Sequence, residues 1–239
     1  MLRPLLVALQ FLTRLPVSAV QRSDRDTGRS MLFYPLVGLL LGLLLAVVSA
    51  LMRGAAPGVI AAVLLALWVF ATGALHLDGL ADSADAWIGG LRDRQRTLDI
   101  MQDPHCGPVA IVVVVVILIA KFAALEALVA KDALVMVATA PVLGRTVLPL
   151  LFVTTPYVRP GGIGSVLAEH LPRKAATVVV IGAALAAGMA SVWMLVAAAL
   201  VFVLARAAML RRIGGTTGDT AGAMLELVET GTLVAGSLT

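Results

Sequence analysis

The chain has 239 residues, of which 60% are hydrophobic and only 13% are charged, and its formal net charge is +4 at pH 7. A water-soluble domain is about half apolar and about a quarter charged, so this composition excludes that class and predicts an integral membrane protein. The single cysteine, Cys106, excludes an internal disulfide and a cysteine-based zinc cluster.

Six apolar segments are long enough to cross a bilayer, which takes roughly 20 mostly apolar residues. In chain order they cover residues 33–52, 57–75, 107–129, 133–153, 175–190 and 192–210. Residues 2–20 are less apolar and are expected to lie at the interface or to enter the membrane in part. Residues 221–238 carry Glu226 and Glu229, which weaken a seventh span. We therefore expect an all-α polytopic membrane bundle of six to seven spans, forming one domain over residues 1–239.

Basic residues predict how this bundle is oriented. If the N-terminus is cytoplasmic, 14 of the 18 Lys and Arg residues fall on the cytoplasmic side, as topology selection favours. The same layout leaves only Glu126 and Asp132 among the acidic residues on the opposite side. Because the basic residues are explained by topology, we expect a lipid bilayer as partner and no nucleic acid.

The stretch TGALHLDGLADSADAWIGG, residues 72–90, brings three aspartates to the end of the second apolar segment. Asp78, Asp82 and Asp85 are spaced i, i+4 and i+7, which places them within roughly 60° of one helix face. Such like charges repel each other, and a divalent cation relieves the repulsion. Oxygen ligands favour Mg²⁺ or Mn²⁺ over Zn²⁺, and Mg²⁺ usually accompanies phosphate chemistry. His76 is a candidate ligand or proton acceptor, with a capping or interfacial role as the alternative.

Two further cytoplasmic stretches carry residues suited to phosphates. LDIMQDPHCGP, residues 98–108, places Asp103 four residues after Asp99 and follows three arginines that include Arg92. Arginine forks match phosphate oxygens, although these arginines serve equally well as topological anchors. A site built from carboxylates and arginines suits phosphoryl or nucleotidyl transfer.

RRIGGTTGDTAGA, residues 211–223, is rich in glycine. Gly215 and Gly218 permit close approach of the backbone to an anion, and Asp219 is a further candidate metal ligand. An ordinary turn between two helices is the alternative. Arg145 lies inside the fourth span and Lys121 inside the third. A buried arginine there requires an anionic contact, and we expect Lys121 to face the bundle interior.

Five blocks of this sequence occur in the order found in cobalamin synthase, also called adenosylcobinamide-GDP ribazoletransferase. They are FLTRLPV, FYPLVGLLLG, GALHLDGLADSADAWIGG, LDIMQDPHCGP and GGTTGDTAGA. The chain resembles this family of membrane enzymes along nearly its whole length. The resemblance implies that adenosylcobinamide-GDP is joined to α-ribazole or its 5′-phosphate, with Mg²⁺ and with release of GMP. The product is adenosylcobalamin or its 5′-phosphate, a late step in vitamin B12 assembly.

The resemblance also implies roles for individual residues. His76 and the three aspartates match the family's acidic motif, Asp103 matches the acidic position after the IM pair, and Gly218 with Asp219 matches the late glycine motif. The expected metal ligands are Asp78, Asp82, Asp85, Asp103 and Asp219, and an aspartate or His76 accepts a proton from the attacking hydroxyl. The expected phosphate-binding residues are Arg14, Arg92, Arg145, Gly215 and Gly218.

The implied location is the bacterial cytoplasmic (inner) membrane, with the active site on the cytoplasmic side. Other enzymes of B12 assembly, or a second copy of the chain, are expected as further partners.

Three other classes fit less well. A CDP-alcohol phosphatidyltransferase would have alanine and arginine at the positions of Asp82 and Ser83. An intramembrane metalloprotease needs HExxH, which the three histidines do not form. A transporter places its ionisable groups near the bilayer midplane, often between inverted repeats, whereas here they gather at one surface.

Overall fold

The computed structural model describes residues 2–17 and 22–239, which are helical apart from loops and two isolated bridges. The end of the expected interfacial segment, residues 18–20, lies outside the described residues. In chain order the helices are α1 (Leu2–Leu12), α2 (Asp24–Ser30), the 3₁₀ helix η1 (Met31–Phe33), α3 (Tyr34–Leu51), α4 (Pro57–Thr72), α5 (Leu75–Gly89), α6 (Arg94–Ile100), α7 (Pro108–Ala130), α8 (Leu134–Thr154), α9 (Gly162–His170), α10 (Arg173–Ala190), α11 (Val192–Ile213) and α12 (Gly218–Ser237).

By length and apolarity, five helical segments in the described part can each cross a membrane, namely Asp24–Leu51, Pro108–Ala130, Leu134–Thr154, Arg173–Ala190 and Val192–Ile213. They confirm five of the six predicted spans. The prediction of one continuous span at 57–75 is wrong. There α4 ends at Thr72 and α5 leaves it at an angle of 87°, so the two helices form a broken span at most. The count is five spans, or six with this bent pair.

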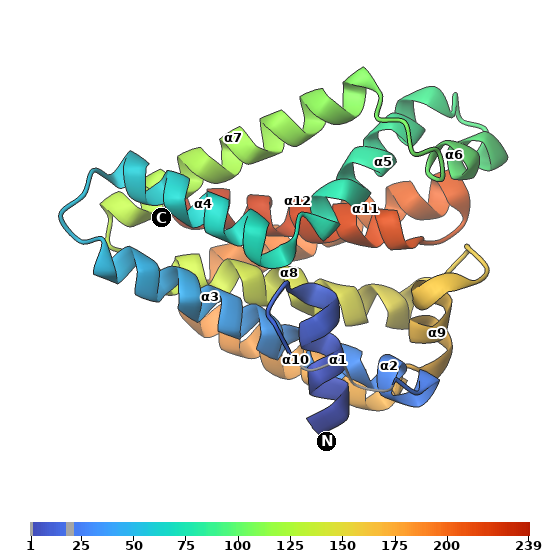
Figure 1. The fold of residues 1–239 in the computed structure, drawn as a ribbon, viewed down its shortest axis with the longest axis horizontal. Helices are drawn as coiled ribbons and strands as arrows, with labels where there is room; N and C mark the ends of the chain where they lie inside the picture. The colour runs from blue at the N-terminus through green and yellow to red at the C-terminus, as the bar shows by residue number, and fades with distance from the viewer. Residues whose placement is uncertain (1, 18–21) are drawn as a thin grey trace.

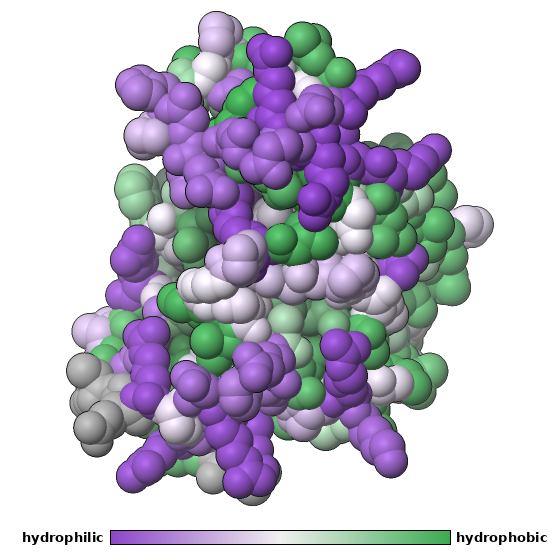
Figure 2. Space-filling model, turned by 90° about the vertical axis from the view of Figure 1, so that its right-hand side faces the viewer, coloured by the Kyte–Doolittle hydropathy of each residue, from purple (hydrophilic) through white to green (hydrophobic). Residues whose placement is uncertain are grey.

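The surface of the bundle is that of a membrane protein. Large apolar side chains stand exposed along the outward faces of α7, α10 and α11, including Ile111, Val115, Ile119, Val178, Ile181, Leu185, Leu200 and Val203. Contiguous apolar patches of this extent are rare on soluble monomers and match hydrocarbon as the solvent. Hydrophilic side chains instead gather on the end face of the molecule that Figure 2 shows.

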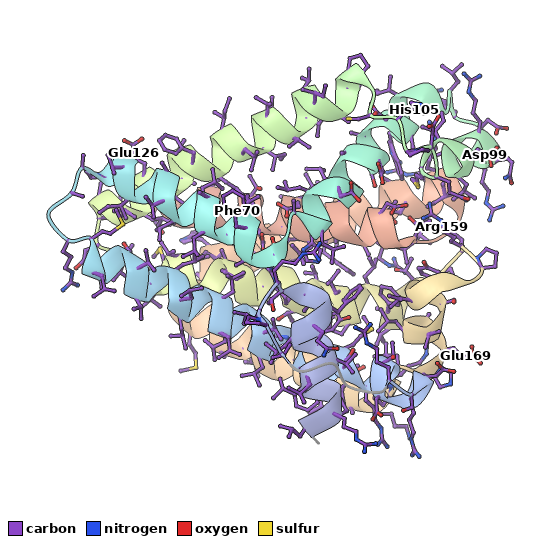
Figure 3. All side chains as sticks on the ribbon, in the orientation of Figure 1. Phe70, Asp99, His105, Glu126, Arg159 and Glu169 are labelled. Atoms are coloured by element: carbon purple, nitrogen blue, oxygen red, sulfur yellow. The ribbon has the colours of Figure 1, made fainter. Side chains whose placement is uncertain are left out.

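Charged residues are divided between the two ends of the bundle (Figure 3). Asp99, His105, Arg159 and Glu169 lie at the right-hand end in that view, which we call the polar end, and Glu126 lies at the other. The separation of the loop charges predicted from the sequence is thus present in the fold.

Helix α12 runs through the centre of the bundle and packs against α5, α7, α8 and α11 (Figure 1). It begins with a capping box in which the side chains of Thr217 and Thr220 bond each other's backbone N–H. Most of its residues are buried, so neighbouring helices shield it from lipid. A helix of this polarity is stable here because its polar groups meet protein rather than hydrocarbon.

The predicted charge layout placed Glu226 and Glu229 on the cytoplasmic side, and for these two residues of α12 the prediction is wrong. Both are buried in the bundle, where Lys121 Nζ lies 2.6 Å from Glu226 and 2.7 Å from Glu229. Arg145 pairs with Glu229, and Lys121 lies over the ring of Trp68, 4.8 Å from its centroid. Two cations and two carboxylates make this buried charge cluster formally neutral, which compensates the cost of burying each ion.

Candidate active site

The site begins at the bend between α4 and α5. Gly73 and Ala74 have left-handed φ values of +64° and +56°, which end α4 and redirect the chain. The backbone N–H of Arg14 donates to the carbonyl of Ala71 at 2.7 Å, tying the segment after α1 to this corner. Helix α5 therefore starts inside the bundle at Leu75 and rises towards the polar end (Figure 1).

Small residues let α5 cross α12 in close contact. A Cβ atom added at Gly79 would lie 2.8 Å from the carbonyl oxygen of Asp219, and one added at Gly222 would lie 3.3 Å from His76. Only glycine allows this approach of two backbones. The crossing brings the aspartates of α5 to the first turn of α12, where Asp82 interacts electrostatically with Asp78 and Asp219.

One arginine faces these carboxylates. Arg159 pairs with Asp219 at 2.7 Å, and its Nε is buried without a hydrogen-bond partner among the described residues. Its loop is held against the start of α12, because the N–H of Val158 donates to Thr216 O and the N–H of Thr216 donates to Pro156 O, both at 2.9 Å.

From the sequence alone, Arg159 is expected only as one of the basic residues that set the topology. The sequence feature that could have pointed to Arg159 as a site residue is the run Pro160, Gly161 and Gly162 beside it, which marks a loop at the membrane surface.

A cavity of about 210 Å³ opens beside this crossing. Its walls include His76, Asp78 and Asp219, together with the rings of Phe11 and Tyr34. His76 is buried, and its Nδ1 has no hydrogen-bond partner in the described part of the chain. Three predicted catalytic or metal-binding residues therefore share one cavity, although they come from segments about 140 positions apart.

Asp85 is engaged elsewhere. Its carboxylate accepts the N–H of Gly107 at 2.5 Å and that of Ala110 at 2.9 Å, so it caps the N-terminus of α7. Both oxygens are used in this way. The structure therefore gives Asp85 a structural role, because α5 and α7 meet at this point, and its predicted metal contact stays a prediction.

Asp103 lies in the exposed loop between α6 and α7. It accepts the backbone N–H of His105 at 3.0 Å and contacts the imidazole Nδ1 at 2.5 Å. The backbone N–H and then the ring of His105 hold the pKa of the Asp103 carboxyl below its ordinary value. The described contacts of Asp103 are with this loop and not with the cavity.

The predicted phosphate-binding residues are dispersed. Gly218 lines the cavity, and Gly215 is buried against Pro156. Arg145 is 1% exposed and pairs with Glu229, so its anionic contact is a carboxylate of the chain itself. Arg92 is exposed in a left-handed turn, and Arg14 lies against Gly73 at the bend.

Within the described residues, no three His, Cys, Asp or Glu side chains are grouped closely enough to hold a metal ion. Asp82 lies in the electrostatic field of Asp78, Asp219 and Asp85, and Arg159 opposes these carboxylates. Because the carboxylates outnumber this arginine, the excess of negative charge fits a divalent cation. Mg²⁺ commonly takes one or two protein carboxylates and completes its shell with water and phosphate oxygens.

The fold and the site together define a class. The chain is a polytopic helical membrane protein whose carboxylates meet an arginine beside a cavity, at the crossing of its bent helix and its central helix. A comparison with protein families gives the particular family. Residues 4–237 match the family described as Cobalamin-5-phosphate synthase, and the chain belongs to it.

Curated relatives agree with this membership and confirm the resemblance drawn from the sequence blocks. A protein of Stutzerimonas stutzeri (strain A1501) named adenosylcobinamide-GDP ribazoletransferase is 54% identical, with 97% of this chain and 96% of the relative covered. One of Pseudomonas aeruginosa (strain UCBPP-PA14) with the same name is 53% identical, with 99% and 98% covered. No solved structure matches the chain.

Proposed function

We propose that this chain is an adenosylcobinamide-GDP ribazoletransferase. It joins adenosylcobinamide-GDP with α-ribazole or its 5′-phosphate and releases GMP. The observation that carries the proposal is the identity above 50% with relatives of that name over almost the full length of both chains. The site supports it, because an α5–α12 crossing with carboxylates and an arginine suits attack on a pyrophosphate.

In this reaction a ribose hydroxyl of the acceptor attacks the phosphorus attached to cobinamide. A new phosphorus–oxygen bond forms, the bond to the pyrophosphate bridging oxygen breaks, and GMP leaves. Arg159, whose Nε has no hydrogen-bond partner among the described residues, binds phosphate oxygens of the donor. Asp82 accepts the proton of the attacking hydroxyl, since general bases of this kind act within hydrogen-bond reach of the reacting group.

One or two of the carboxylates of Asp78, Asp82 and Asp219 would hold Mg²⁺, with water and phosphate oxygens as its other ligands. When bound, the ion neutralises charge on the pyrophosphate oxygens. Arg159 also orients the donor, because it lies at the same crossing and pairs with Asp219. Asp85 takes no part in the chemistry and instead keeps α7 in place. We further propose that the polar end faces the cytoplasm of a bacterial inner membrane, as the excess of Arg at that end favours.

The experiment is GMP release by membranes that contain the chain, supplied with adenosylcobinamide-GDP and α-ribazole, with and without Mg²⁺. The wild type should release GMP only with Mg²⁺, and Asp82→Asn should abolish the release. Asp99→Asn is the matched control, because Asp99 lies in α6 and bonds Gln95 at 2.8 Å. Failure of folded wild-type protein to release GMP would overturn the assignment, and CDP-alcohol substrates would be tested next.

A further inference from the structure

The cavity beside the α5–α12 crossing has a deep end and a mouth. His76 lines the cavity and is 5% exposed, so it lies inside the bundle. Asp219 instead pairs with Arg159, which lies at the polar end and is partly exposed. His76 therefore marks the deep end, and Asp219 marks the mouth, where the proposed chemistry takes place.

The walls between these two ends are apolar and aromatic. Phe11 and Tyr34 stack with their ring centroids 6.3 Å apart, and Phe152 and Leu167 contribute further apolar surface. His76 Nδ1 is buried among them without a hydrogen-bond partner in the described chain. A buried polar atom of this kind costs free energy unless a ligand satisfies it.

We propose that this cavity binds the dimethylbenzimidazole ring of the α-ribazole acceptor, with His76 Nδ1 donating to the free ring nitrogen. The inference rests on the function proposed above and adds the subsite that selects the acceptor base. The base is a flat, largely apolar bicycle with one nitrogen left free by the glycosidic bond. It thus matches aromatic walls that carry an imidazole nitrogen without a hydrogen-bond partner among the described residues.

The other parts of the two substrates do not match this cavity. A cavity of about 210 Å³ is far too small for a corrin macrocycle. Guanine carries donors and acceptors around its edge, and the apolar walls of Phe11, Phe152 and Leu167 would leave the groups facing them unpaired at a cost in affinity. With the base at the deep end, the ribose extends to the mouth, and its hydroxyl reaches the carboxylates.

The test is to narrow the cavity and to measure each substrate separately. Ile163 is a wall residue that is about half exposed, so Ile163→Phe adds bulk with little strain on the core. We expect the KM for α-ribazole to rise by about ten- to a hundredfold, as for a misfit of this size in an apolar pocket. The KM for adenosylcobinamide-GDP should change less than about twofold, since an unaltered subsite retains its binding energy.

The decisive experiment asks whether a smaller acceptor restores the activity of Ile163→Phe. The α-riboside of unmethylated benzimidazole should recover most of the lost kcat/KM in Ile163→Phe but not exceed α-ribazole in the wild type. Leu185→Phe is the control, because Leu185 lies on the lipid-facing side of α10. Phe11→Leu is the substitute variant if Ile163→Phe proves unstable. It removes an aromatic wall and should raise the KM for α-ribazole.

Two results would overturn the subsite. One is a rise in the KM for adenosylcobinamide-GDP in place of that for α-ribazole. The other is a folded Ile163→Phe protein with both KM values unchanged. Either result leaves wild-type GMP release intact, so failure of the subsite is distinct from failure of the proposed function.

Discussion

Gly79 of α5 lies against the backbone of Asp219, so closely that a Cβ atom would come within 2.8 Å of the Asp219 carbonyl oxygen. This contact joins the two segments whose carboxylates form the candidate site. Gly79→Ala must push α5 away from α12, because backbone atoms cannot rotate aside. Overpacking of this kind costs about 1–3 kcal/mol.

We expect Gly79→Ala to lower the stability by that amount and GMP release more than tenfold. Thermal unfolding in detergent and the GMP assay measure the two effects. Gly182→Ala is the matched control, since Gly182 lies in α10 with nothing within 4 Å of an added Cβ. Alanine there should be neutral or slightly stabilising. An equal loss in both variants would contradict the crossing as the cause.

The buried charge cluster predicts a large effect from the loss of one partner. Lys121→Met leaves Glu226 and Glu229 with only Arg145, and removal of one member of a buried pair costs about 3–5 kcal/mol. Adding Glu226→Gln to Lys121→Met should recover part of this loss, because it removes the carboxylate left uncompensated. Thermal unfolding of the single and double variants checks the coupling.

An exposed ion pair gives the contrast. Arg53 and Asp132 lie 3.4 Å apart with side chains 67% and 69% exposed, at the end of the bundle opposite the polar end. Such pairs contribute about 0–1 kcal/mol. Arg53→Gln should therefore leave unfolding almost unchanged. A loss as large as that of Lys121→Met would mean that burial does not govern these pairs.

Asp85 and Asp82 should behave differently although they lie on one helix stripe. Asp85→Ala removes both acceptors at the start of α7, which we expect to lower stability by about 0.5–2 kcal/mol. Its Mg²⁺ requirement should remain that of the wild type, measured as GMP release against Mg²⁺ concentration. An increase in the Mg²⁺ concentration that Asp85→Ala requires would show that Asp85 is a metal ligand.

Arg159 is expected to bind the donor phosphates. Arg159→Gln should lower kcat/KM for adenosylcobinamide-GDP by about tenfold or more, since a hydrogen bond to a charged group contributes about 1.5–3 kcal/mol. Arg92→Gln is the comparison, because Arg92 is exposed in its turn. Steady-state kinetics with varied donor separates the two variants, and equal effects would count against a specific role for Arg159.

Much of the fold was predictable because hydrophobic length and charge placement are local properties of the sequence. Five spans, the membrane class and the sidedness of the loop charges follow from runs of about 20 residues and the basic residues between them. The carboxylate motif and its family were also visible in short blocks. Gly73 was present in the sequence, but nothing local indicated that two successive left-handed residues would break the second span.

The tertiary structure alone decided which side chains share a site. Asp78, Asp82 and Asp85 share one helix stripe, yet Asp85 accepts two N–H groups at the start of α7 while Asp82 lies in the electrostatic field of Asp219. Lys121 pairs with Glu229, which lies 108 positions away in the sequence, and this contact allows the charged residues of α12 to be buried in the core. Helical periodicity fixes the face on which a residue lies, but the partner on that face depends on how helices pack, through contacts that no local pattern encodes.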